Sequence, residues 1–180
     1  LAIAEIKDNQ LIERVHPCLI LKNSYIANVN GVLNAIVVDG NPIGRSVLQG
    51  EGAGPGPTSS AIISDLCSIL SGNIKYPFGI SCFLRKKIEK FNILNHTCPS
   101  YLRIEVKDQP GVLSSITKSF AKNSISIKNL IQKPNKKNKK ASIIIITHEN
   151  SEKNFKNLLS NLTKNRFVLK KPTFIRIETV

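Results

Sequence analysis

The chain has 180 residues, of which 41% are apolar, and its formal net charge is +14 at neutral pH. This length permits one domain or two small ones, and no apolar run approaches the roughly 20 residues that a membrane-spanning helix needs. The four cysteines (Cys18, Cys67, Cys82 and Cys98) form no Cys-x-x-Cys pair, so they predict neither a zinc site nor a disulfide framework, and we expect free thiols in a reducing cytoplasm.

The charge is distributed unevenly along the chain. Residues 1–72 contain four Lys or Arg and six Asp or Glu, whereas residues 73–180 contain twenty-two and six. A basic half is typical of proteins that bind nucleic acid or an acidic membrane surface. Many of these lysines stand beside asparagines, which favours lysines spread over solvated faces instead. We therefore expect no membrane partner and keep nucleic acid as an alternative partner.

The first predicted elements are two β-hairpins. Strands at residues 1–6 and 11–21 flank Asp8-Asn9, which tolerate the positive φ of a tight turn, and Pro17 interrupts the second strand. Strands at residues 32–38 and 43–49 flank Asp39-Gly40-Asn41-Pro42, where Asp-Gly is a strong hairpin signal. The chain opens in an apolar run without basic residues ahead of it, so we expect no signal peptide and a chain cut from something longer.

A glycine- and proline-rich loop at residues 50–57 follows and leads into a helix. Apolar residues at helical spacing from Ala61 to Leu70 predict this helix, with Thr58 or Ser59 as its cap and Gly72 at its end. The loop has the composition of a phosphate-binding turn. It lacks the lysine of a P-loop, however, and a proline stands where the dinucleotide fingerprint requires its third glycine.

The rest of the chain predicts a linker and a compact α+β unit. Residues 73–99 are polar and basic without a clear period, which is typical of a linker. Strands are then expected at residues 101–108, 124–132, 141–149 and 167–180, with helices at 110–123 and 151–165. Ser151 can cap the second helix, and Pro172 kinks the last strand. The order β-α-β-β-α-β is that of the ferredoxin-like fold.

Two turns of this unit carry a specific pattern. One is Asp108-Gln109-Pro110-Gly111 with Val112 and Leu113, and the other leads from Asn123 and Ser124 into the next strand. Proline and glycine let the backbone turn sharply into a helix N-terminus, whose free amides can hold a carboxylate. The pattern resembles the ACT domain, a regulatory module that binds amino acids. The resemblance implies an effector held by these residues between paired domains of a homo-oligomer; a structural turn without a ligand is the alternative.

The same order of elements also occurs in RNA-recognition modules, which stack bases on aromatic residues of their central strands. Here the corresponding strand reads Ile143-Ile144-Ile145-Ile146, which argues against such a platform. We expect the lysines between Lys133 and Lys140 to keep a hairpin tip solvated.

Three motifs follow one another in the first 72 residues. They are His16-Pro17, Asn34-Ala35-Ile36 and the loop Gly52-Ala53-Gly54-Pro55-Gly56-Pro57-Thr58. Together they resemble the C-terminal end of the catalytic region of homoserine dehydrogenase. The resemblance implies hydride transfer between homoserine and aspartate-semialdehyde with NAD or NADP, with Gly54 as the main cofactor contact and Gly52 and Ala53 as its neighbours. Glycines that only permit a tight entry into the helix are the alternative.

The family's nucleotide-binding domain and catalytic lysine would precede Leu1. We therefore assign no catalytic residue and no metal site, and we expect the fragment alone to be inactive.

These interpretations combine into one expected architecture. An α+β chain would hold a fragment of a mixed-sheet catalytic domain at residues 1–72, a linker at 73–99, and a ferredoxin-like ACT domain at 100–180. The resemblance implies a cytoplasmic dehydrogenase of threonine and methionine biosynthesis, an oligomer or dimer through its ACT domains, with threonine as the feedback effector. The alternative of another class is a non-catalytic ferredoxin-like module whose basic surface binds nucleic acid.

Overall fold

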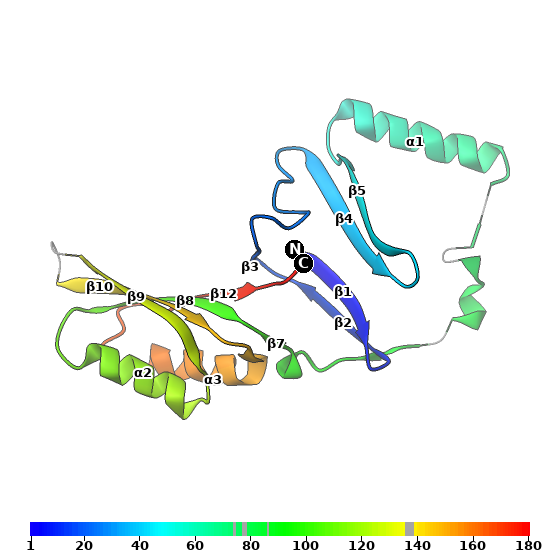
Figure 1. Cartoon of the computed structure of the whole chain (residues 1–180). Helices are drawn as coiled ribbons and strands as arrows, with labels where there is room; N and C mark the ends of the chain where they lie inside the picture. Colours follow the sequence, from blue (N-terminus) through cyan, green and yellow to red (C-terminus); the bar gives the residue numbers. More distant parts are fainter. Residues whose placement is uncertain (74, 77–78, 86, 136–138) are drawn as a thin grey trace. The chain divides into compact units, whose positions relative to one another are not determined.

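The computed structural model describes residues 1–73, 75–76, 79–85, 87–135 and 139–180. It divides into two compact units, one made of Leu1–Leu19 with Ile88–Thr179 and the other of Ile20–Lys87 with Val180. Both combine strands and helices (Figure 1). The predicted α+β class is therefore confirmed.

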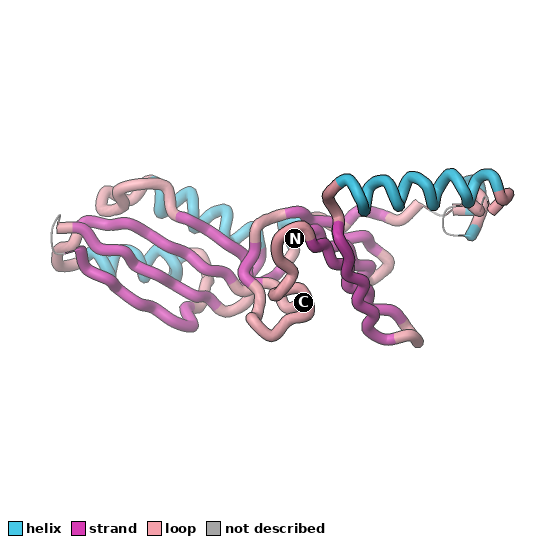
Figure 2. The backbone as a smooth tube through the Cα atoms, turned by 90° about the horizontal axis from the view of Figure 1, so that it is seen from above, coloured by secondary structure: helices cyan, strands magenta, loops and turns pink. Residues whose placement is uncertain are grey.

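The first unit is built on a five-stranded mixed sheet. The strand order is β3 (Cys18–Leu19), β12 (Thr173–Ile177), β8 (Ser100–Lys107), β10 (Lys140–Thr147) and β9 (Ile127–Asn135). Helices α2 (Val112–Lys122) and α3 (Glu152–Thr163) lie together on one face of this sheet, as both views show (Figures 1 and 2). The β-α-β-β-α-β arrangement is the predicted ferredoxin-like fold.

The core of this unit follows from alternation along the two central strands. Leu102, Ile104 and Val106 of β8 and Ile143 and Ile145 of β10 are fully or almost fully buried, and the two strands pair antiparallel with Ile143 opposite Ile104. Because successive side chains of a strand point to opposite faces, these residues all meet the two helices. The helices contribute Ile116, Phe120, Phe155, Leu158 and Leu162 to the same cluster.

The ends of these elements depend on single residues. Gly111 caps α2 with a positive φ of 85°, and the Ser151 side chain accepts a hydrogen bond from the Asn154 amide at the start of α3, as predicted. The last strand differs from the prediction, because β12 begins only after Pro172, which has no amide to donate to a ladder. The preceding residues touch β8 through an isolated bridge between Val168 and Val106.

Smaller sheets complete the first unit. β1 (Ala2–Lys7) and β2 (Gln10–Val15) form the predicted hairpin, with φ of 50° at Asp8 and 60° at Asn9, and β2 also pairs with β6 (Glu89–Lys90). β7 (Thr97–Cys98) pairs with β11 (Asn150–Ser151), and a short 3-10 turn, η3, covers Ile93–Asn95. Pro17 separates β2 from β3, which is the interruption that we predicted.

The second unit contains the other hairpin and one long helix. β4 (Leu33–Gly40) and β5 (Gly44–Glu51) pair antiparallel, and α1 (Pro55–Leu70) follows, then a 3-10 turn, η2, at Cys82–Leu84. Asp39 and Gly40 lie inside β4, so the turn falls on the next residues rather than on the predicted Asp-Gly. Across the strand pair the Asp39 carboxylate accepts two hydrogen bonds of 2.7 Å from Arg45.

Helix α1 ends as predicted but begins earlier. Gly54 is its N-cap and Pro55 its first residue, so the prediction that Thr58 or Ser59 caps the helix is wrong. At the other end, the amides of Gly72 and Asn73 donate to the carbonyls of Ile69 and Ser68, which is the hydrogen-bond pattern of a Schellman motif. Within the described part of the chain α1 buries no residue.

The predicted lysine-rich hairpin tip is shorter than expected. β9 runs to Asn135 and β10 starts at Lys140, so Lys133 and Lys140 lie in strands. Residues 136–138 lie outside the described residues. No helix among the described residues is long and apolar enough to span a membrane.

Candidate functional site

The loop that leads into α1 is shaped by two glycines with different constraints. Gly54 has φ 116° and ψ 157°, a backbone conformation that is essentially restricted to glycine. Gly52 has a packing constraint instead, because a Cβ atom there would lie 1.3 Å from the Nδ2 atom of Asn34. The Gly52 amide also donates to the carbonyl of Val32 at 2.9 Å. The loop is therefore held closely to β4.

The start of α1 offers few hydrogen-bond donors. A helix usually leaves its first four amides free, but Pro55 and Pro57 have none, and the Thr58 amide donates to the Gly54 carbonyl at 3.2 Å. The amides available there are those of Gly54 and Gly56, and a Cβ on Gly56 would meet nothing within 4 Å. With two free amides and no lysine, the start of this helix offers fewer contacts to an anion than a P-loop does.

The second predicted site is the turn between β8 and α2. The Asp108 amide donates to the Lys139 carbonyl at 2.9 Å, and Gln132 Nε2 lies 3.4 Å from the Asp108 carboxylate. Gly111 then turns the chain into α2, where Val112 is buried in the core and Leu113 is 38% exposed. The turn thus faces the start of β10 on one side and opens to solvent on the other.

An open hollow of about 700 Å³ lies beside this turn. Its lining combines three lysines with an acid, an amide and an apolar residue: Lys107, Asp108, Gln109, Lys139, Lys140 and Leu169. Lysine ammonium groups attract a carboxylate, and the Asp108 carboxylate attracts an ammonium group. The hollow therefore presents both charges that an amino-acid zwitterion needs.

Asn123 and Ser124 lie at the opposite end of α2 from this turn. Asn123 follows the last residue of the helix, and its Nδ2 donates to the Ser119 carbonyl at 2.8 Å. Ser124 has φ 56°, and its carbonyl accepts a hydrogen bond of 2.7 Å from Asn150. An eleven-residue helix separates the ends by roughly 16 Å. One chain therefore does not bring the two predicted groups together.

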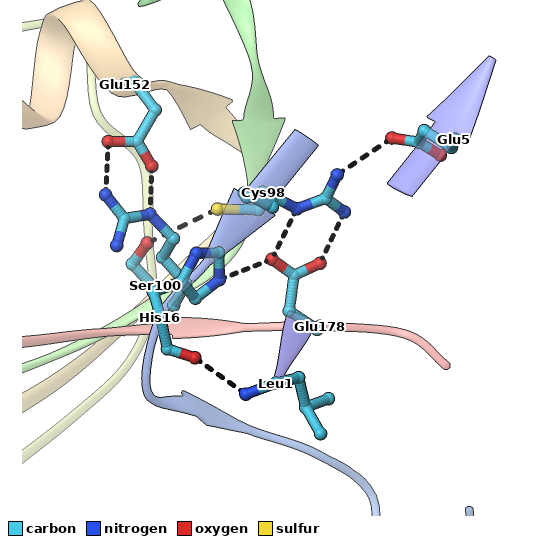
Figure 3. Close-up of polar contacts among 9 residues, drawn as sticks. Leu1, Glu5, His16, Cys98, Ser100, Glu152 and Glu178 are labelled. Carbon is cyan, nitrogen blue, oxygen red and sulfur yellow. Dashed lines mark hydrogen bonds and ion pairs between the residues drawn. The ribbon is translucent and has the colours of Figure 1, made fainter. Parts of the chain in front are cut away.

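Sequence reasoning missed a cluster of charged side chains at the other end of the sheet, in which all members but Glu5 are largely buried (Figure 3). We call it the Glu178 cluster; it consists of Glu5, Arg14, His16 and Glu178. Arg14 donates through Nε and Nη2 to the two oxygens of Glu178 at 3.2 and 3.0 Å, and through Nη1 to Glu5 at 3.1 Å. His16 Nε2 lies 2.9 Å from Glu178 Oε1.

Burial and charge act against each other at Glu178. Burial disfavours its ionised form, but the hydrogen bonds and charges of Arg14 and His16 outweigh this and hold the pKa of Glu178 below its usual value. A second pair lies nearby, in which Arg176 binds both oxygens of Glu152. Burial raises the pKa of the Cys98 thiol to about 11, so this cysteine stays a thiol at neutral pH.

His96, two residues before Cys98, is another partly buried titratable group. Its Nε2 atom is buried without a hydrogen-bond partner. Burial, followed by the charge of Arg14, lowers the pKa of His96. In the part of the chain that the structure describes, His, Cys, Asp and Glu side chains form no group of three or more that could hold a metal ion.

Two family models match separate parts of the chain. Residues 2–67 match the model described as homoserine dehydrogenase, and residues 100–167 match the model described as ACT domain. The loop at Gly52–Gly54 lies in the first match, and the Asp108 turn lies in the second. The two parts of the candidate site therefore belong to different families.

Curated relatives match across nearly the whole chain. The homoserine dehydrogenase of Helicobacter pylori is 36% identical over 165 residues, which cover 92% of this chain and 39% of that protein. The homoserine dehydrogenase of Neisseria gonorrhoeae is 34% identical over 173 residues, which cover 93% and 40%. This chain therefore spans about two fifths of the length of these relatives.

Solved structures of homoserine dehydrogenases also match this chain. The crystal structure of a homoserine dehydrogenase from Thiobacillus denitrificans matches 99% of this chain and 41% of its own, with a TM-score of 0.83 and 32% identity. A Staphylococcus aureus homoserine dehydrogenase shares the fold at a TM-score of 0.53 and 22% identity.

Proposed function

We propose that this chain is the regulated C-terminal portion of a homoserine dehydrogenase, because residues 2–67 belong to the homoserine dehydrogenase family and residues 100–167 belong to the ACT-domain family. The observation that carries the proposal is the succession of the two families in one chain, within relatives that align over more than nine tenths of it. The reaction would interconvert L-homoserine and L-aspartate 4-semialdehyde in the cytoplasm, as part of threonine and methionine biosynthesis. An intact enzyme would use NAD or NADP as the hydride carrier.

In this proposal residues 1–72 supply one wall of the cofactor site, residues 73–99 a connection, and residues 100–180 the regulatory domain. The wall consists of Gly52, Ala53 and Gly54, with the Gly54 and Gly56 amides as donors. We assign no catalytic residue to the chain, and we expect it to be inactive alone.

A chimera tests the dehydrogenase proposal. This chain would replace the matching segment of the Thiobacillus denitrificans enzyme, and homoserine-dependent reduction of NAD and NADP would be measured. We expect activity in the chimera, and Ala53→Leu should raise the KM for the cofactor at least tenfold because its side chain adds bulk to the wall. Gly50→Ala is the matched control, because a Cβ there meets nothing within 4 Å. A folded but inactive chimera would contradict the proposal.

We propose threonine as the effector that binds at the Asp108 turn. The lysines of the hollow would meet its carboxylate, and Asp108 would meet its ammonium group. Calorimetry with L-threonine on the 180-residue chain should show binding that Asp108→Asn weakens and Glu149→Gln does not. The absence of heat at millimolar threonine, with the chain folded, would contradict this assignment. The roles of Asn123 and Ser124 as effector contacts stay a prediction.

We also propose that ACT domains of two chains pair into a homo-oligomer, a dimer in the simplest case. The open face of the sheet supports this proposal, because Ile131 of β9 is 53% exposed beside partly buried Ile144. Light scattering on the 180-residue chain should give at least twice the monomer mass. On this face β10 carries Ile144 and Ile146, where RNA-recognition modules stack bases on aromatic side chains, and Tyr101 of β8 is the aromatic residue opposite Ile146, so the nucleic-acid module is not favoured.

A further inference from the structure

The Glu178 cluster joins two segments that are far apart in the sequence. Arg14 and His16 lie at and just beyond the end of β2, in the segment that matches homoserine dehydrogenase. Glu178 directly follows β12, the last strand of the ACT sheet, 164 residues from Arg14. The cluster therefore links the segment that matches homoserine dehydrogenase to the last strand of the ferredoxin-like sheet within one compact unit.

A backbone connection lies beside the cluster. β3 pairs in parallel with β12, with Leu19 opposite Ile177, and the Glu178 amide donates to the Leu19 carbonyl at 2.9 Å. Glu178 is thus bound through its backbone to one part of residues 1–19 and through its side chain to another part. The segment also pairs with β6, which is not part of the five-stranded sheet, so its described connections to that sheet are the bonds of Glu178 and the pairing of β3 with β12.

The hydrophobic core does not share in this connection. The apolar cluster of the sheet takes its buried members from Leu102 to Leu162 and its partly buried members from Ile127 to Phe174. Among residues 1–19, all of which are described, the buried apolar side chain is Ile12, and it is not in that cluster. Residues 1–19 can therefore leave the ACT sheet without opening its core, which is the condition for a local opening.

The cluster itself favours two states and disfavours intermediates. The side chains of Arg14, His16 and Glu178 are only 9%, 10% and 6% exposed. A buried charge that loses its partner is strongly unfavourable, whereas charges that separate into water are both hydrated. Two arrangements avoid an unpaired buried charge: in one the cluster is closed and fully paired, and in the other it is open and its charges are hydrated.

We propose that the Glu178 cluster is a releasable connection, whose opening frees residues 1–19 from the ACT sheet while the ACT core stays folded. The opening itself does not depend on the proposed function. Its use in regulation does rest on that function: a ligand that prefers one position of β12 would shift the balance between the closed and open states. The homoserine dehydrogenase segment would then respond to the ACT domain through Glu178.

Hydrogen exchange measured by mass spectrometry on the 180-residue chain tests this proposal without any ligand. In Glu178→Gln, we expect the amides of residues 1–19 to exchange at least tenfold faster, while those of β8 and β10 keep their rates. Unchanged exchange in residues 1–19 would overturn the proposal. An equal increase in β8 and β10, or unfolding of the whole chain, would also overturn it, because the cluster would then be part of the core's stability.

Two controls sharpen the result. Glu105→Gln breaks an exposed ion pair of 2.7 Å with Lys170 in the same sheet, and it should leave the exchange of residues 1–19 unchanged. The double variant Arg14→Gln with Glu178→Gln should exchange no faster than either single variant, because each alone already opens the cluster; additive increases would contradict a single two-state connection. These expected exchange rates do not depend on threonine binding, so a chain that fails to bind threonine would not contradict them.

Discussion

At the scale of single residues, Gly54 shows how a backbone requirement can exist apart from any ligand. Its φ of 116° and ψ of 157° fall in a region that side chains rarely allow, although a Cβ would have space, since the nearest atom, Pro57 Cδ, is 3.6 Å away. The constraint is therefore conformational rather than steric. A cofactor contact and the entry into α1 would both make use of the same conformation.

Gly54→Ala should consequently destabilise the α1 entry by about 1–3 kcal/mol, the usual cost of such a conformation. Chemical denaturation followed by circular dichroism would measure the loss. Gly56→Ala is the matched control, because Gly56 has no positive φ and no atom within 4 Å of its Cβ position. Equal effects of the two substitutions would show that the conformation of Gly54 is not the cause.

We expect His96 to make the free energy of unfolding depend on pH. Burial and the Arg14 charge lower the pKa of His96, while the carboxylates of Glu178, Glu152 and Glu5 act in the opposite direction. The folded chain therefore holds this imidazole neutral more strongly than the unfolded chain does. Its contribution to stability is complete above the unfolded pKa of about 6.5 and is lost as the pH falls below that value.

We expect the free energy of unfolding to decrease between about pH 7 and about pH 5.5, before most carboxylates begin to titrate. His96→Gln should flatten this part of the profile, because glutamine does not titrate. Urea denaturation at a series of pH values would measure it. A slope that persists in His96→Gln would assign the pH dependence to another group.

At the scale of elements, the sequence predicts best where the cause is local. Asp8 and Asn9 adopt positive φ in their turn, Ser151 caps α3, and alternation along β8 and β10 identifies the buried face. The start of α1 was predicted wrongly because two local rules compete there. Thr58 is a good cap, but a proline after a glycine starts the helix four residues earlier, with Gly54 as the cap.

Ser151→Ala should remove the hydrogen bond to the Asn154 amide and destabilise the first unit by about 1 kcal/mol. Thermal or urea unfolding would detect the change. Ser160→Ala, at an exposed position of the same helix, should cost nothing measurable, since alanine favours a helix. A loss of the same size in both variants would mean that the cap is not what stabilises α3.

Contacts over long sequence distances explain what the sequence did not predict. The partners of Glu178 lie 162 and 164 residues away, and in the sequence each resembles an ordinary solvated charge. Asn123 and Ser124 were grouped with Asp108 by resemblance, but the length of α2 separates them within the chain. The Asp108 turn itself was predicted from Pro110 and Gly111, whereas Lys139 and Lys140 reach it from the start of β10, which is distant in the sequence.

At the scale of the whole molecule, the two units differ in how much apolar surface they bury. The first unit has the hydrophobic cluster under its sheet, while α1 buries no residue and leaves Ile62, Leu66 and Ile69 at least half exposed in the described structure. A helix without a packed face is marginally stable in water. The stability of the chain is therefore concentrated in the first unit.

Native-state hydrogen exchange of the 180-residue chain should show this difference directly. We expect amides of β8 and β10 to exchange only by global opening, and those of α1 to exchange at least a hundredfold faster through local fraying. A substitution in the core such as Leu158→Ala should accelerate the first group and leave the second unchanged. Equal protection of α1 and β8 would show that α1 is packed in solution.

Strand β3 has a consequence for how the ACT sheet meets other molecules. A sheet edge with unpaired amides and carbonyls is a template for another strand, and proteins commonly block such edges with short segments. With only two residues, β3 occupies the outer edge of β12, while β9 forms the opposite edge. A piece cut at residue 100 would expose the β12 edge and favour self-association there, so an ACT-domain fragment that stays soluble should retain residues 1–19.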